Sequence, residues 1–165
     1  MVRAATDEDR AFILEMARLA CGLEGRHPVP AADDPSVLAM LPNAEDVAAV
    51  AVNDARQTIG AAWCHTHDPP LLLDDHGMAL PEVALAVLPA ARGRGVGASL
   101  LDAVADATRA RAPALSLNVH LLHPAVRLYI RSGFRVAGHG RGWYGVAMRR
   151  PLGDQAHPSS GQQAR

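Results

Sequence analysis

The chain has 165 residues, of which 49% are hydrophobic and 20% charged, and its formal net charge at pH 7 is −1. This length allows one domain with a substantial hydrophobic core and is short for two. The nearly balanced charge gives no electrostatic basis for binding nucleic acid or an anionic membrane. No apolar run approaches the length of a transmembrane helix, and the N-terminal sequence "MVRAATDEDR" lacks the apolar segment of a signal peptide.

Strands and helices are predicted from the changing period of the hydrophobic residues. Three acidic residues follow Thr6 and suit the first turn of a helix with Thr6 as its N-cap, while Pro124 opens a later helix that Gly133 closes. The expected strands are 2–5, 45–54, 57–65, 82–88, 114–120, 134–138 and 143–150, and the expected helices are 7–21, 35–41, 96–111 and 124–132. This order predicts a mixed α/β sheet in one domain over residues 1–150. The remaining residues, 151–165, are polar and rich in Pro, Gly and Ser, which predicts a disordered tail.

Two residue types bear on the environment of the protein. Cys21 and Cys64 lie in the apolar segments "ARLACGL" and "GAAWCH" without metal-ligand spacing, which is typical of reduced core thiols in a cytoplasmic protein. All 16 basic residues other than histidine are arginine, so the chain contains no lysine. Its one ordinary amine is the α-amino group of Met1.

The segment "PAARGRGVGASL" places three glycines directly before a helix-forming sequence. Such loops commonly bind phosphate, because backbone N–H groups and the helix N-terminus converge on the anion. A P-loop requires a lysine, which this chain lacks. A dinucleotide fingerprint is formally matched by Gly93, Gly95 and Ala98. However, the strand does not run directly into the glycines, and no acidic residue follows about 20 residues later.

A third pattern, R-x-x-G-x-G, is formed by Arg92, Gly95 and Gly97 after an apolar strand. The glycines let successive N–H groups approach an anion, and the new helix adds its partial positive charge. Arg92 and Arg94 add full charges. This pattern predicts a loop that binds a pyrophosphate.

Two linked stretches make the sequence resemble the GNAT acetyltransferase superfamily. "PEVALAVLPAARGRGVGASLL" is similar to the family's fourth strand and acetyl-CoA pyrophosphate loop. "LSLNVHLLHPAVRLYIRSGF" is similar to its fifth strand and following helix, with the motif A-x-x-L-Y-x-x-x-G-F. The two stretches cover residues 81–136, and the element order extends the resemblance to about 1–150. It implies the GNAT fold with splayed fourth and fifth strands, and an acetyl-CoA-dependent N-acetyltransferase that needs no metal.

The resemblance also implies where acetyl-CoA binds. The cofactor would lie between the splayed strands, with its pantetheine amides paired to the fourth strand and its pyrophosphate on the glycine loop. The implied cofactor-binding residues are Leu85, Ala86, Val87, Arg92, Gly93, Arg94, Gly95, Val96, Gly97, Ala98, His123 and Tyr129.

Three positions within the resemblance carry chemistry. Tyr129 matches the family's tyrosine that protonates the departing thiolate; otherwise it is a helix tyrosine with its ring in the core. Glu82 matches a glutamate that draws the proton from the acceptor amine through water; otherwise it is a solvated acid at a strand end. His123 replaces the family's asparagine, so it either caps the helix weakly, contacts CoA or acts near the thioester.

The loop "CHTHDPPLLLDDHG" has a composition that could hold a metal ion. Its candidate ligands are His65, His67, Asp68, Asp74, Asp75 and His76. The H-x-H pattern lacks a third ligand at fixed spacing, so we expect no metal site.

The acceptor can be described only by its chemical class. The resemblance places the same loop near the acceptor, and its acids, together with Asp33 and Asp34, favour a cationic amine on a small molecule or peptide. The alternative to an enzyme is a non-catalytic acyl-CoA-binding sensor, but the presence of both Glu82 and Tyr129 favours the enzyme. The resemblance allows a homodimer, which is frequent in the family.

Overall fold

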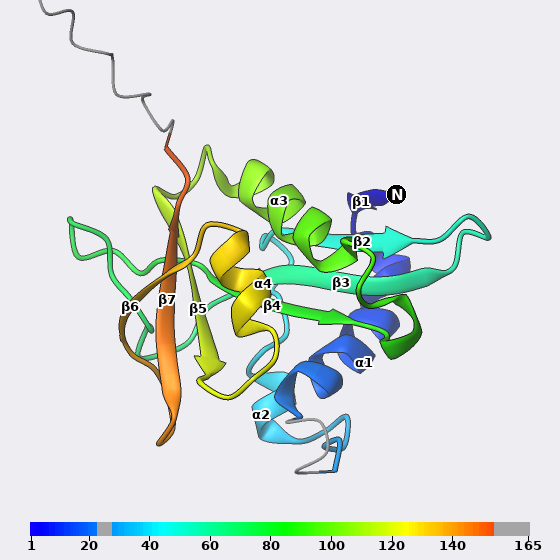
Figure 1. Cartoon of the computed structure of the whole chain (residues 1–165), viewed down its shortest axis with the longest axis horizontal. Coiled ribbons are helices and arrows are strands. Elements are labelled where there is room, and N and C mark those ends of the chain that lie inside the picture. Colours follow the sequence, from blue (N-terminus) through cyan, green and yellow to red (C-terminus); the bar gives the residue numbers. More distant parts are fainter. Residues whose placement is uncertain (23–27, 154–165) are drawn as a thin grey trace, which may run out of the picture.

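The structure is a computed structural model that describes residues 1–22 and 28–153. A seven-stranded mixed sheet with the order β1-β2-β3-β4-β5-β7-β6 forms its centre (Figure 1). The strands are β1 (Val2–Ala4), β2 (Ala48–Val52), β3 (Thr58–His65), β4 (Glu82–Val87), β5 (Ala114–His120), β6 (Arg135–His139) and β7 (Gly145–Pro151). The helices are α1 (Arg10–Cys21), α2 (Pro35–Leu38), α3 (Val96–Thr108) and α4 (Val126–Arg131), with short 3-10 turns at Asp7–Asp9 and Pro89–Ala91. The predicted mixed α/β sheet is confirmed.

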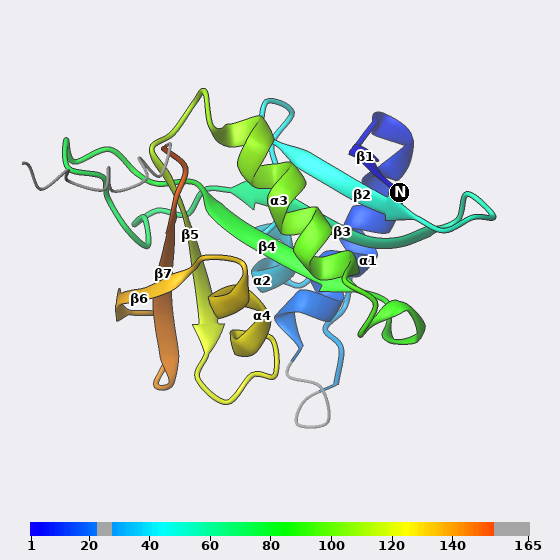
Figure 2. The ribbon, with the colours of Figure 1, turned by 45° about the horizontal axis from the view of Figure 1, so that its top comes forward.

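Helices cover both faces of the sheet, and the side chains of β3 alternate between them. Ala61 and Trp63 pack with α1 and α2, whereas Ala62 and Cys64 pack with α3. Figure 2 shows α1 and α3 on opposite sides of the sheet. Because both faces are buried, β3 is a nearly continuous apolar run. Within the described residues, no helix has the length and apolar character needed to cross a membrane.

The parallel pair β4 and β5 joins the two halves of the sheet. It has a single register position, Glu82 opposite Ser116. There the Ser116 N–H donates to the carbonyl of Pro81 at 2.9 Å. Beyond this point the strands diverge, and Figure 1 shows β5 and β7 running across the direction of β1–β4. The edge of β4 that faces β5 is therefore left without a strand partner after Glu82.

The end of α4 follows its local sequence. Gly133 has φ +88°, a left-handed conformation that favours glycine. Its N–H donates to the carbonyl of Ile130 at 3.1 Å, and the Phe134 N–H donates to that of Tyr129 at 3.0 Å. These two bonds form a Schellman motif, which confirms Gly133 as the C′ residue. Phe134 is fully buried and fixes the helix end to the core.

The start of the first predicted helix differs from expectation. Residues Asp7–Asp9 form a 3-10 turn, and α1 begins only at Arg10. The Asp9 carboxylate turns back to accept the Thr6 N–H at 2.8 Å and both terminal nitrogens of Arg3 at 2.7 and 2.9 Å. This side chain ties the helix start to β1 and tightens the first turn.

The first residues of the expected tail are folded in the structure. Pro151 is the last residue of β7, and Leu152 is 2% exposed, with its N–H donating to the carbonyl of Pro113. The first residues of the predicted tail are therefore packed, because an apolar side chain there completes the core. Residues 154–165 of the predicted tail lie outside the described residues.

Candidate active site

The divergence of β4 and β5 opens a cleft of about 1740 Å³. This exceeds the roughly 300–1,000 Å³ of common small-molecule sites and suits an extended ligand. The unpaired edge of β4 lines it at Leu85, Ala86 and Val87, and the glycine loop and α4 complete it. Every residue of the expected cofactor site lines this cleft except Arg94, whose exposed side chain lies outside it.

The glycine loop has the backbone geometry expected for anion binding. Gly93 and Gly95 have φ +73° and +80°, left-handed values that side chains rarely allow. Gly95 is the N-cap residue of α3, so the first N–H groups of that helix have no partner within it. A Cβ on Gly97 would lie 2.9 Å from Leu128 Cδ2, so glycine there lets α3 approach α4.

The side chain of Arg92 is hydrogen-bonded to the end of β4. Its Nε donates to the carbonyl of Val87 at 2.9 Å, at the end of β4. This bond fixes the guanidinium beside the glycine loop. A full positive charge thus stands at the end of the cleft where the helix N-terminus adds its partial charge.

Tyr129 reaches the cleft from α4. Its ring contacts Phe134 edge-to-face, with centroids 5.9 Å apart, and burial raises the pKa of its hydroxyl to about 12. The hydroxyl therefore keeps its proton at neutral pH. Just before α4, the Nδ1 atom of His123 accepts the Ala125 N–H at 3.0 Å. This bond closes a turn before α4, whose N-cap residue is Ala125 and which has no side-chain cap, so the role of His123 stays a prediction.

Glu82 lies at the other end of the β4 edge and is not a solvated acid. It is 5% exposed, and its two carboxylate oxygens accept hydrogen bonds from Arg141 Nη1 at 2.6 and 2.7 Å. Arg141 Nη2 donates to the carbonyl of Pro69 at 3.3 Å, and the Arg141 N–H donates to Asn118 Oδ1 at 2.8 Å. Arg141 thus joins the β6–β7 loop to the β3–β4 loop, to the start of β4 and to the second half of β5.

Sequence reasoning did not identify Arg141. The one signal was its setting between glycines in "GHGRGWYG". A Cβ on Gly140 would collide with Asn118 Oδ1, and one on Gly145 would collide with the backbone of Arg141. These glycines are needed for a tight loop that presents the arginine.

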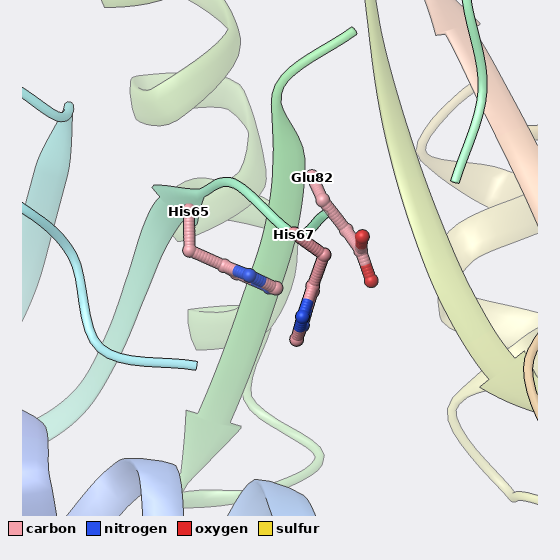
Figure 3. A group of neighbouring side chains, drawn as sticks. All are labelled: His65, His67 and Glu82. Carbon is pink, nitrogen blue, oxygen red and sulfur yellow. The ribbon is translucent and has the colours of Figure 1, made fainter. Parts of the chain in front are cut away.

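The histidine loop is brought against Glu82. His65 ends β3 directly opposite Glu82, and its ring meets that of His67 edge-to-face with centroids 4.8 Å apart (Figure 3). Candidate ligand atoms of His65, His67 and Glu82 lie within 4.8 Å of one another, so Glu82 is the third group that the loop sequence lacked. Arg141 already places a positive charge on this carboxylate, which opposes a cation there.

His65 is the most buried of these groups. It is 2% exposed, its Nδ1 has no hydrogen-bond partner among the described residues, and burial lowers its pKa to about 4. Its imidazole is therefore neutral at pH 7. The other candidate ligands of the loop lie outside this cluster, and Asp74 instead accepts the N–H groups of His76 and Met78 at 2.8 Å.

Solved structures with the same fold are known. A phosphinothricin acetyltransferase from Sinorhizobium meliloti, solved with acetyl-CoA, is 22% identical over 98% of this chain and 94% of its own, with a TM-score of 0.68. An N-acetyltransferase from Staphylococcus aureus Mu50 is 18% identical over 93% and 98%, with a TM-score of 0.67. A GCN5-related N-acetyltransferase from Kribbella flavida is 29% identical over 92% and 96%, with a TM-score of 0.64.

The sequence comparisons agree with the fold. No curated protein matches the chain. The family model of the acetyltransferase (GNAT) domain matches residues 44–136, more than half of the chain. This span includes β4, the glycine loop and α4, the elements that form the cleft. The chain therefore belongs to the GNAT acetyltransferase family.

Proposed function

We propose that this protein transfers the acetyl group of acetyl-CoA to an amine by direct attack of the amine on the thioester. One observation carries the proposal. The unpaired edge of β4 faces a cleft that ends at a glycine loop and a helix N-terminus. The Sinorhizobium meliloti acetyltransferase, which has this fold, was solved with acetyl-CoA.

The residues present suit acetyl-CoA. Backbone groups of Leu85, Ala86 and Val87 can pair with the amides of a pantetheine arm, as an added strand would. The N–H groups of residues 93–98 can bind the pyrophosphate. A free N–H on the β4 edge can polarise the thioester carbonyl as charge develops on its oxygen.

The proton of the leaving thiol is assigned to Tyr129. Tyr129 lines the cleft, and its hydroxyl remains protonated at neutral pH because burial raises its pKa to about 12. Glu82, the residue expected to accept the proton of the amine, lies at the end of the β4 edge where the amine would bind. A sensor that only binds acyl-CoA would need the cleft but not a protonated hydroxyl within it, so the enzyme is favoured.

We propose an amine as the acceptor, and a positive charge on it stays a prediction. Two of the acids that favoured a cationic acceptor serve local turns, because Asp34 caps α2 through Ser36 and Asp74 organises its own loop. Acetyl-CoA is an intracellular metabolite, so the proposed reaction is consistent with the predicted cytoplasmic location. The homodimer stays a prediction.

Two measurements test this function. Titration calorimetry should show one acetyl-CoA bound per chain. Release of free CoA thiol, followed across a panel of amines, should depend on the amine and yield an N-acetylated product. Binding without turnover on any amine would favour the sensor, and a protein that binds no acetyl-CoA would refute the proposal.

A further inference from the structure

At the acceptor end of the cleft lie Glu82, Arg141, His65 and His67, and the carboxylate of Glu82 is already paired with a cation. Both of its oxygens are engaged by Arg141 Nη1 at 2.6 and 2.7 Å, and its side chain is 7% exposed. A general base needs a lone pair within hydrogen-bond reach of the proton that it removes. Each oxygen of Glu82 keeps a second lone pair, but Glu82 would have to take up a proton directly beside the guanidinium that both oxygens already contact.

The imidazoles beside Glu82 also have available lone pairs. His65 is neutral at pH 7 because burial lowers its pKa, and its buried Nδ1 has no partner among the described residues. His67 is half-buried and, like His65, lines the cleft. Figure 3 shows the two rings next to each other, beside the carboxylate of Glu82.

The electrostatic setting keeps this pair ready to accept one proton. The charged groups that face it are Glu82 from β4 and Arg141 from the β6–β7 loop, which neutralise each other. His65 adds no charge of its own at neutral pH. A proton that passes from the amine to His67 would therefore lie beside the Glu82 carboxylate.

We propose, building on the function above, that His67 accepts the proton of the acceptor amine, while His65, Glu82 and Arg141 are positioning residues. The nitrogen of a neutral amine forms a bond to the acetyl carbonyl carbon, and the carbon–sulfur bond breaks with its electron pair passing to sulfur. The proton of the attacking nitrogen moves to the ring nitrogen of His67. Tyr129 protonates the sulfur, and solvent then restores both groups.

The first test measures kcat/KM against pH, with acetyl-CoA and hydroxylamine as the amine, and expresses the rate per concentration of unprotonated hydroxylamine. In the parent protein, the rate should fall as the pH is lowered, because a protonated imidazole cannot accept a proton. His67→Gln should lower kcat/KM by about 100-fold and remove this acidic limb. Glu82→Gln should lower the rate but keep the limb. His76→Gln, a matched change in the same loop but outside the cleft, should behave as the parent.

The second test does not depend on turnover. Ring signals of ¹⁵N-labelled histidine, assigned with the same variants, should show His65 neutral down to about pH 5. A His65 that is protonated at pH 6 would overturn the proposal.

Other outcomes separate this inference from the proposed function. Turnover whose acidic limb survives in His67→Gln but disappears in Glu82→Gln would return the base to Glu82 and leave the acetyltransferase intact. Loss of activity with a chelator, restored by Zn²⁺, would make the histidines ligands and overturn the inference. Failure to bind acetyl-CoA would overturn both.

Discussion

Burial decides the chemistry of several single residues in this protein. Tyr129 is held protonated because its phenolate would be poorly solvated, and Cys64 has a pKa raised to about 11 for the same reason. His65 is held neutral because burial disfavours its cation. One physical effect thus keeps the hydroxyl of Tyr129 protonated and the imidazole of His65 neutral.

Replacing Tyr129 with phenylalanine tests its role as the donor. Tyr129→Phe should lower kcat by about 100-fold, because general acid catalysis contributes at least that much. Acetyl-CoA affinity, measured by calorimetry, should stay nearly unchanged, since one oxygen atom is removed. In the parent protein, ionisation of the Tyr129 hydroxyl should cause no loss of activity up to pH 10, because its pKa is about 12. Tyr144→Phe, at an exposed tyrosine, is the control, and equal activity of the two variants would contradict the role.

The Asp9 carboxylate should stabilise the fold in a pH-dependent way. It is 4% exposed, and hydrogen bonds from Arg3 and Thr6 lower its pKa. Its contribution should be complete above the unfolded-state pKa of about 3.9 and be lost as the pH falls through the lower folded value. Asp9→Ala should lower the free energy of unfolding at pH 7 by about 1–3 kcal/mol, because it removes the charged acceptor of the Arg3 and Thr6 hydrogen bonds.

Urea unfolding at pH 7 and at pH 3 measures this effect. Asp7→Ala is the matched control, because Asp7 pairs with Arg10 at a site where both side chains are mostly exposed. It should change stability by less than about 1 kcal/mol. Equal midpoints for the two variants at pH 7 would show that Asp9 does not stabilise the helix start.

At the scale of elements, the site depends on two strands that separate and on a loop that follows one of them. The β4–β5 divergence exposes backbone groups that a continuous sheet would pair. The loop then delivers the chain into α3 with left-handed glycines, so that N–H groups face the cleft end. Neither element needs a particular side chain for binding, but both need a particular backbone.

Replacing Gly95 with valine should damage this backbone. A side chain at φ +80° costs roughly 1–2 kcal/mol, and a β-branched one costs more. Gly95→Val should weaken acetyl-CoA binding by at least about 10-fold, because the N–H groups of the loop lose their alignment toward phosphate. Gly138→Val is the matched control, since Gly138 has an ordinary φ and open space around it. Unchanged affinity in a folded Gly95→Val protein would refute the loop assignment.

At the scale of the whole molecule, the absence of lysine limits how readily acetyl-CoA can acetylate the protein itself. A thioester acetylates neutral amines, and this chain has no ε-amine. Its α-amino group donates to the carbonyl of Val52 at 3.0 Å. Burial raises the pKa of both Cys21 and Cys64, so the thiols stay protonated and poorly nucleophilic.

Prolonged incubation with acetyl-CoA should therefore leave the protein mass unchanged, or increased by one acetyl group at Met1. Intact-mass spectrometry measures this. Arg94→Lys is the control, because it places a single ε-amine on the exposed loop and should allow one further acetyl group to accumulate. Several added groups on the parent protein would mean that hydroxyls or thiols react readily, and O-acetyl transfer would become the preferred function.

The sequence by itself determined the features that depend on neighbours along the chain. The left-handed glycines before α3, the Schellman end of α4 and the turn at His123 each involve residues at most a few positions apart. Their conformations follow from local sterics and hydrogen bonding. The motifs around them also identified the family, and hence the arrangement of the cleft. Even here, Asp9 moved the start of α1, because its partner Arg3 lies in a strand.

Only the tertiary structure decided the acceptor end. Glu82 and Arg141 are 59 residues apart, and no pattern in the sequence pairs them. His65 meets Glu82 only because β3 and β4 align in that register, and Leu152 is buried only because β7 returns beside β5. Such contacts depend on strand order and on the burial of apolar surface across the whole sheet. Sequence spacing therefore could not show that the expected base is held by an arginine beside a neutral histidine.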